Sequence, residues 1–451
     1  MGLGLIRAWT GIMYAEGAAE FSSQPHSSYM AFDFVTAFVL VVLAALSYHV
    51  APLYRRRFVM PLTALLLVVC TLLNFLPVFS PANSYVSMNA IAIVFGAVGI
   101  ALYLMLWSEL YGCIGPLKVA LYYAAGIMVS ALVLWVLKST SLICLFVCMC
   151  VLPIILMISL WRAYAHLSLD DVPKAPVAKS SFPWKPALAM AVYAFARGMQ
   201  VSLSSDDVGA SSSIGFFGGA LLVYIGIAWK REDFNFSSLW KIAMPLMLLS
   251  LFPWGRFLPF GSTLSGTLSL AAYALMLILM MSILGNISYR YGVCALWLFA
   301  IERATRLVAV QLGELWGGNL GAATMLSPEA SQIVANVVFV VLIVITALMF
   351  ASERQIDSSW GIILKMPISR DTSLALAKTR LGVRCHELAQ SYELTAREEE
   401  ILLLIFQQNK PRDIARILQI ELNTVNTHIK HVYQKLGTHS RKETLALLGI
   451  E

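Results

Sequence analysis

A series of long apolar segments before residue 351 limits how this chain can fold more than any other feature. Eleven of them have close to the roughly 20 residues that a helix needs to cross a bilayer. The chain is 59% hydrophobic and only 13% charged, which lies outside the composition of soluble globular proteins. We therefore predict an all-α integral membrane protein. The segments are Ala31–Val50, Phe58–Phe79, Tyr85–Trp107, Pro116–Leu137, Leu142–Trp161, Lys185–Leu203, Ser213–Trp229, Leu239–Trp254, Thr263–Leu284, Tyr291–Leu315 and Ile333–Phe350.

A polar stretch, Arg162–Pro183, divides these segments into five before it and six after it. Gly2–Ala19 is a shorter candidate, which either spans or lies on the membrane surface as an amphipathic helix. If it spans, the polytopic bundle has about 12 spans in a 6+6 arrangement. The predicted divisions are membrane half 1 at 1–161, a central cytoplasmic loop at 162–184 and membrane half 2 at 185–351. Equal halves joined in this way resemble the major facilitator architecture.

Basic residues in the predicted loops favour one orientation. Because Lys and Arg are enriched in cytoplasmic loops, their distribution predicts a cytoplasmic C-terminus. The loops on the other side contain only Lys138 and Arg256 among Lys and Arg. The loops on the predicted cytoplasmic side contain Arg55, Arg56, Arg57, Arg162, Lys174, Lys179, Lys230, Arg231 and Arg290.

The C-terminal region, 392–451, has a different pattern, in which short amphipathic helices alternate with turn residues. Thr395 and Glu398 have the spacing of a capping box, and Pro411 can occupy the first turn of a second helix. A third helix is predicted over about Leu422–Leu436. Its inward-facing positions are Val425, Ile429, Val432 and Leu436. The pattern predicts a four-helix domain that contains a helix-turn-helix.

Four short motifs in this region resemble the LuxR-type, or NarL/FixJ-type, helix-turn-helix family. They are LTxRE at 394–398, DIA at 413–415, TVxTHI at 424–429 and KLG at 435–437. The resemblance implies that the third helix enters the major groove of double-stranded DNA, and that a fourth helix, about Ser440–Leu448, pairs two copies in a homodimer. The chain departs from the family at Gln408, Glu421 and Asn426, where Gly, Ser and Lys are usual. The predicted DNA-binding residues are Thr424, Asn426, Thr427, His428, Lys430, His431 and Lys435.

Charged residues inside the apolar segments point to a ligand site, because charges at bilayer depth are costly. Arg197 and Glu302 are each predicted near the middle of a span, and Arg303 and Arg306 accompany them. Glu302 and Arg306 can pair on one helix face, which leaves Arg197 and Arg303 available for an anionic small molecule. The alternative is a structural network in which Glu16, Glu314 or backbone carbonyls hold these arginines.

The remaining features indicate a linker and no catalytic site. The stretch 352–391 is basic and weakly helical, and we expect its charges to contact membrane lipid. The cysteines lack the spacing of a metal site, and Cys144, Cys148 and Cys150 are interpreted as packing residues. We expect no cofactor and no enzymatic activity.

Together these patterns predict a membrane-bound one-component transcription regulator. Its membrane domain would sense an unknown small molecule in the inner membrane of a bacterium, and its helix-turn-helix would bind operator DNA. The alternative is a major-facilitator-like transporter with a regulatory DNA-binding tail. The family's Gly/Asp/Arg signature after the second span is reduced here to Arg55, Arg56 and Arg57, which weakens the transporter alternative.

Overall fold

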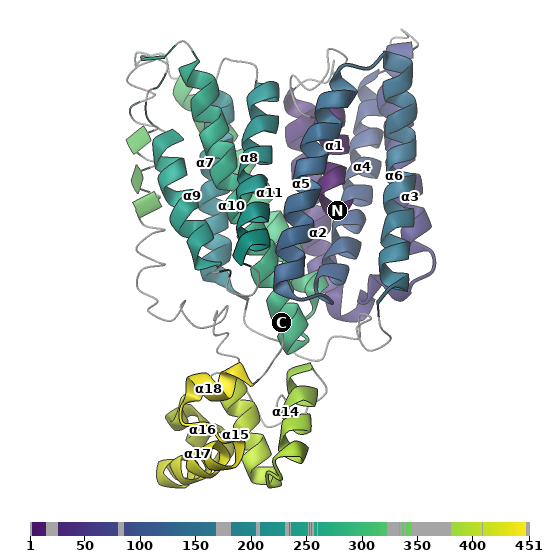
Figure 1. The fold of residues 1–451 in the computed structure, drawn as a ribbon. Coiled ribbons are helices and arrows are strands. Elements are labelled where there is room, and N and C mark those ends of the chain that lie inside the picture. Colours follow the sequence, from purple (N-terminus) through teal and green to yellow (C-terminus); the bar gives the residue numbers. More distant parts are fainter. Residues whose placement is uncertain are drawn as a thin grey trace.

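The computed structural model describes residues 2–14, 26–79, 85–167, 182–203, 208–230, 234, 236–250, 252, 254, 257, 258, 260–322, scattered positions between 333 and 344, 380–407 and 409–447. Most of the predicted span Ile333–Phe350, the linker up to 379, Glu16 and Gln408 lie outside these residues. The described parts are built from α-helices, as predicted. Figure 1 shows a large helical bundle with a small helical domain at one end.

The first half of the bundle contains six helices. They are α1 Gly2–Tyr14, α2 His26–Val50, α3 Val59–Phe79, α4 Tyr85–Tyr111, α5 Pro116–Lys138 and α6 Leu142–Ala165. Within the candidate segment Gly2–Ala19, helix α1 covers Gly2–Tyr14 and packs against α5, α6 and α4 inside the bundle. Ala8 and Trp9 are fully buried, and the Tyr103 hydroxyl donates a hydrogen bond to the Gly2 carbonyl at 2.7 Å. The described part of the segment, α1, is therefore buried against other helices of the bundle.

The structure gives the bounds of five helices in the second half. They are α7 Trp184–Leu203, α8 Val208–Lys230, α9 Ser237–Ser250, α10 Gly261–Tyr291 and α11 Ala295–Ala322. The halves meet where α2 lies along α11 and where α5 lies along α8. The second helix of each half thus contacts the fifth helix of the other, as expected for two repeats related by a pseudo-two-fold axis.

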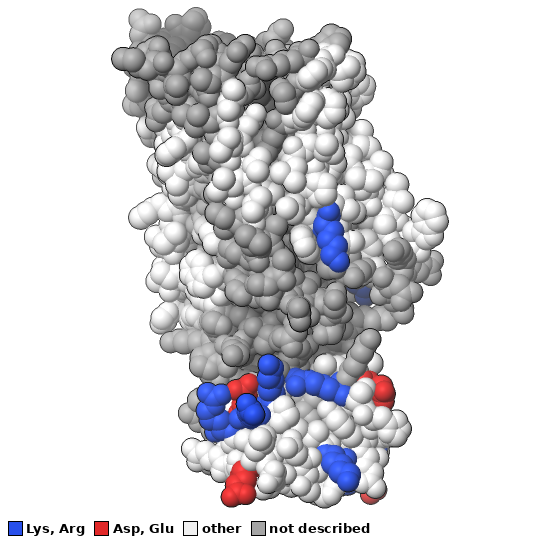
Figure 2. Space-filling model, turned by 90° about the vertical axis from the view of Figure 1, so that its left-hand side faces the viewer, with Lys and Arg blue, Asp and Glu red and all other residues white. Residues whose placement is uncertain are grey.

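Six helices are long and apolar enough to cross a membrane by length and composition: α2, α3, α4, α5, α6 and α10. The extent of burial separates a central helix from peripheral ones. In the most apolar part of α10, 83% of the residues are buried, but in that of α6 only 28% are. The exposed apolar side chains of α6, such as Ile143 and Trp161, suit contact with lipid tails. On the face in Figure 2, charged side chains are sparse on the described part of the bundle and gather on the small domain.

Helices α7 and α11 approach each other unusually closely. A Cβ atom added at Gly198 would lie 2.0 Å from the Val310 carbonyl oxygen, and one at Gly313 would lie 2.1 Å from the Phe195 carbonyl oxygen. Only glycine permits backbones to touch in this way. The contact holds Arg197, beside Gly198, next to the charged face of α11.

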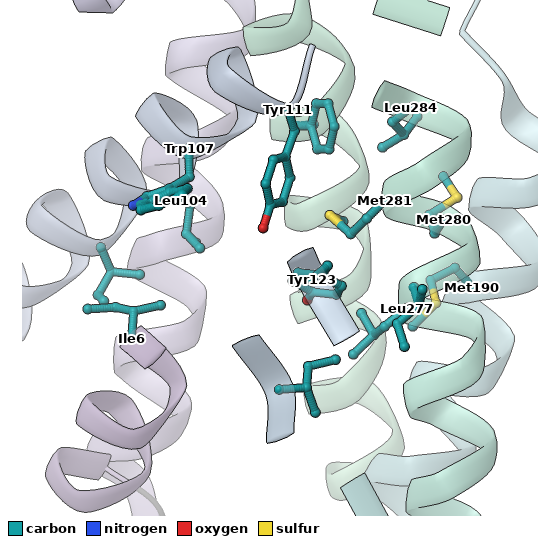
Figure 3. Packing of buried hydrophobic residues seen from close by; sticks show 14 of the residues in the cluster. Ile6, Leu104, Trp107, Tyr111, Tyr123, Met190, Leu277, Met280, Met281 and Leu284 are labelled. Carbon is teal, nitrogen blue, oxygen red and sulfur yellow. The ribbon is translucent and has the colours of Figure 1, made fainter. Parts of the chain in front are cut away.

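Aromatic and sulfur-containing side chains fill the interface between α4, α5 and α10. Figure 3 shows Tyr111 of α4, Tyr123 of α5 and Met281 of α10 near one another, with Met190 of α7 beyond them. The Tyr111 and Tyr123 rings meet edge to face with centroids 6.3 Å apart. Both halves therefore share one continuous core.

The C-terminal domain has its own core. Its helices are α14 Arg380–Ser391, α15 Ala396–Phe406, α16 Pro411–Leu418, α17 Leu422–Leu436 and α18 Arg441–Ala446. Leu381, Cys385 and Leu388 of α14 pack with residues of α15 and α17, so α14, in the predicted linker, belongs to this domain. A second cluster joins α15, α16 and α17. Clusters separate from the bundle are expected of a unit that folds independently.

Candidate functional site

Three of the four charged residues predicted in the membrane region lie near groups of the first half: Arg197 near Tyr29 of α2, and Glu302 and Arg306 near Tyr123 of α5. Glu302, Arg303 and Arg306 belong to α11, and Arg197 belongs to α7. Neither α7 nor α11 is among the six helices that are long and apolar enough to cross a membrane, because charged residues interrupt their apolar sequences. At about 1.5 Å per residue, Arg197 and Arg306 lie deep within their helices.

Glu302 and Arg306 form an ion pair, as their four-residue spacing predicts. Arg306 Nε lies 2.9 Å from Glu302 Oε1, and both side chains are buried. Arg306 Nη1 also donates a hydrogen bond to the Tyr273 hydroxyl of α10 at 3.0 Å. The pair is therefore fixed between α11 and α10.

Arg197 has more neighbours than the sequence suggested. Its guanidinium lies within electrostatic range of Tyr29 of α2, Tyr273 of α10 and the carboxylate of Glu314 of α11. Glu314 was one of the counter-ions considered in the structural alternative. Arg303 is half-buried beside Glu302, but the contacts described for the cluster do not include it.

Two charged residues that the sequence-based site omitted also belong to this cluster. Asp33 of α2 accepts a hydrogen bond from Gln311 Nε2 of α11 at 2.8 Å, and both residues are buried. Arg7 of α1 lies over the ring of Phe216 of α8, 3.1 Å from its centroid. Both contacts connect the first half to the second. Asp33 and Arg7, like Arg197, are charged residues within apolar segments, a sequence signal that marks candidate site residues.

Several buried polar atoms of the cluster have no partner within the described part of the chain. They include Oε2 of Glu302, Nη2 of Arg306 and Oε1 of Gln311. Leaving such an atom unpaired costs about 1–3 kcal/mol. Buried groups of this kind are usually satisfied by a water molecule or a ligand.

In the C-terminal domain, α17 presents the predicted DNA-binding face. Thr424, Asn426, Thr427 and Lys430 are exposed, whereas Val425, Val432 and Leu436 are buried in the domain. The Thr427 hydroxyl donates to the Asn423 carbonyl within the helix. His428 is half-buried and His431 is exposed. The short side chains at the start of α17 suit entry into a major groove.

Lys435 has a structural partner. Its Nζ atom lies 2.8 Å from Glu398 Oε2 and donates to the Glu393 carbonyl at 3.0 Å. Glu398 is also the acidic member of the predicted capping box with Thr395, which the structure confirms. Burial alone would raise the pKa of Glu398, but hydrogen bonds from Lys435 and Thr395 outweigh it and lower the pKa to about 2. Lys435 therefore ties α17 to α15.

The ends of α16 and α17 are set by particular residues, and at one of them the chain departs from the family pattern. Glu421 occupies the N-cap of α17 but its side chain makes no capping hydrogen bond, whereas serine would accept one. Pro411 occupies the first turn of α16, as predicted. Gly437 ends α17 with a φ of 68°, a conformation that glycine adopts at little cost.

Among the described residues, no group of three or more His, Cys, Asp or Glu could hold a metal ion. Cys385 packs in the domain core, and burial raises its pKa to about 12. Its thiol therefore stays protonated and serves as an apolar packing group.

Known proteins resemble the C-terminal domain in sequence. Residues 392–448 match the model of the GerE family, described as bacterial regulatory proteins of the luxR family. A protein of Mycobacterium tuberculosis named as an HTH-type transcriptional regulator is 33% identical over 98 residues, covering 22% of this chain and 11% of that protein. One from Sinorhizobium fredii with a similar name is 39% identical over 74 residues, covering 15% of this chain and 23% of that protein.

The bundle resembles a solved transporter in fold. A proton:xylose symporter of the major facilitator superfamily aligns with a TM-score of 0.55 at 12% identity, covering 78% of this chain and 95% of that chain. At this identity the similarity concerns the fold alone. The chain therefore joins a LuxR-type helix-turn-helix domain at residues 392–448 to a helical membrane bundle with the major facilitator fold.

Proposed function

We propose that this protein is a membrane-bound one-component transcription regulator. The exposed face of α17 in a LuxR-type domain, attached to a membrane bundle, is the observation that carries the proposal. The proposal places the bundle in the inner membrane of a bacterium. The proposal also places the C-terminal domain in the cytoplasm. Arg55, Arg56 and Arg57 favour the cytoplasmic side for their loop, and the distribution of Lys and Arg over all the loops favours the same side for the C-terminus.

The DNA contacts are assigned to the exposed residues of α17. Thr424, Asn426 and Thr427 would face base edges, and Lys430 would contact phosphate. Two domains would pair through α18 on a two-fold operator. Ser440 caps α18 and Arg441 donates to the Ile405 carbonyl, so α18 is held on α15 with Glu443 exposed.

The sensing function is assigned to the buried charge cluster between the halves. A ligand that contacts both halves would favour one of their arrangements. The change would reach the C-terminal domain through the linker and α14, which packs into the core of that domain. The basic residues of the linker would contact anionic lipid. We assign no catalytic role to any residue.

The second candidate function is solute transport with a regulatory tail. It is favoured by the major facilitator fold together with charged residues buried between its halves. Uptake of solute by membranes containing the protein would support it, and uptake should then depend on Arg197 and Glu302.

Chromatin occupancy of the full-length protein in its own cell tests the regulator directly. Discrete sites with a two-fold motif are expected, and the variant with both Asn426→Ala and Lys430→Ala should lose them. The control variant is Gln390→Ala, which removes an exposed amide from α14. Absence of discrete sites, or equal loss in both variants, would contradict the regulator and leave transport as the function to test.

A further inference from the structure

Arg7 is a cation at the interface between the halves that has no carboxylate partner among the described residues. One face of its guanidinium lies on Phe216 of α8. The neighbours within electrostatic range are Tyr123, Tyr273, Arg197 and Arg306, of which two are cations. Arg7 is only partly buried although it lies inside the bundle, so a further partner has room beside it.

Arg306 provides a second free donor on the opposite half. Its Nε atom is used by Glu302 and its Nη1 atom by Tyr273. Nη2 is buried with no hydrogen-bond partner in the described residues, and the same holds for Oε2 of Glu302. The ion pair therefore keeps one unused donor and one unused acceptor.

The two arginines converge on the same aromatic residues. Phe216, under Arg7, meets Tyr273 edge to face with centroids 6.0 Å apart, and Tyr273 binds Arg306. Tyr123 of α5 lies within electrostatic range of both Arg306 and Arg7. The guanidinium groups of Arg7 and Arg306 therefore lie near the same two tyrosines, Tyr123 and Tyr273.

The other acids of the cluster have different partners. Asp33 accepts from Gln311, although Arg306 is also within its electrostatic range. Glu314 lies near Arg197. The charged groups within electrostatic range of Arg7 are Arg197 and Arg306, and both are cations. This local excess favours an anionic ligand.

We propose that Arg7 and Nη2 of Arg306 bind one small carboxylate between the halves. Charge-assisted hydrogen bonds from guanidinium groups are among the strongest in proteins. Oε2 of Glu302 would accept a hydrogen bond from a hydroxyl or amino group beside the carboxylate. The ligand class is therefore a carboxylate with an adjacent donor. Because Arg7 belongs to the first half and Arg306 to the second, binding would stabilise the arrangement in which the halves are together. The inference rests on the sensing function proposed above.

Thermal unfolding of the purified full-length protein tests this site without DNA. The probes are lactate and alanine at 50 mM, with lactamide and alaninamide as matched compounds without a carboxylate, all at equal ionic strength. Lactate or alanine should raise the unfolding temperature while the amides do not. Arg7→Gln should raise the concentration for a half-maximal shift by about tenfold or more, since a charge-assisted contact is lost.

Two further variants separate binding from folding. Arg306→Gln alone would leave Glu302 without its cation, so it is combined with Glu302→Gln, and the double variant should fold but lose the shift. Arg55→Gln, at an exposed arginine, should keep it. No shift with either carboxylate, equal shifts with the amides, or a full shift in Arg7→Gln would overturn the site. If the site is overturned but the full-length protein still occupies operator DNA in the cell, only the carboxylate site is wrong. If a carboxylate raises the unfolding temperature but the protein occupies no operators, only the proposal of a transcription regulator is wrong.

Discussion

Two lysines of α17 should have different roles. Lys430→Ala should change DNA binding and keep the stability of the domain, whereas Lys435→Ala should lower the stability and keep the salt dependence of DNA binding. Lys430 is exposed on α17. The Lys435 side chain is 37% exposed but lies 2.8 Å from Glu398, whose side chain is 6% exposed. We therefore expect Lys430 to neutralise a DNA phosphate and Lys435 to stabilise the domain.

Counter-ion release sets the size of the Lys430 effect. Each neutralised phosphate contributes about 0.9 to the slope of log affinity against log salt concentration. Lys430→Ala should lower the slope by that amount, so the affinity lost between about 50 and 200 mM salt becomes roughly 3.5-fold smaller. Its free energy of unfolding should change by less than about 0.5 kcal/mol, as for most surface substitutions.

Lys435→Ala should instead destabilise the domain. It leaves the Thr395 backbone N–H as the remaining hydrogen-bond donor to the buried Glu398 carboxylate among the described contacts, with His431 Nδ1 4.0 Å from Oε1. Loss of a partner by a buried charged group costs about 1–3 kcal/mol. The salt slope of the folded protein should stay unchanged.

Fluorescence anisotropy with operator DNA over a salt series, together with urea unfolding of residues 380–451, measures both quantities. The two cores of this region support its use as a separate fragment. A reduced slope in Lys435→Ala with unchanged stability would refute the assignment, as would an unchanged slope in Lys430→Ala.

Three further predictions concern the same domain and use urea unfolding as the measurement. The lowered pKa of Glu398 contributes stability that is present above its unfolded value of about 4.5 and is lost as pH falls toward 2. Glu398→Gln should therefore be less stable than the native chain at pH 7, and the difference should shrink between pH 4.5 and 2; a constant difference would contradict the linkage. Glu421→Ser should stabilise α17 by about 1 kcal/mol, because serine adds the missing N-cap hydrogen bond, and no gain would show that the cap is satisfied otherwise. Gly437→Ala should destabilise the domain by about 1 kcal/mol, since alanine is strained at a φ of 68°; an unchanged midpoint would argue against that conformation.

Local patterns in the sequence determined the elements of this protein. Apolar stretches of bilayer length predicted α2 to α6 nearly to their ends, because composition and length alone decide whether a helix can reside in lipid. The third predicted helix of the C-terminal domain, Leu422–Leu436, has the bounds of α17. Its helical period placed Val425 and Val432 in the core. The spacing of Glu302 and Arg306 predicted their pair because neighbours on one helix need no tertiary information.

Contacts between distant segments were decided only by the tertiary structure. Asp33 and Gln311 are 278 residues apart, and Arg7 meets Phe216 across the two halves. Neither partner follows from periodicity, because helix rotation and the packing of the halves select it. The same holds for Lys435, which belongs by sequence to a recognition helix but is directed by packing toward Glu398 of α15. Sequence places a charge on a helix face, and the fold decides whether that face meets DNA, a ligand or another side chain.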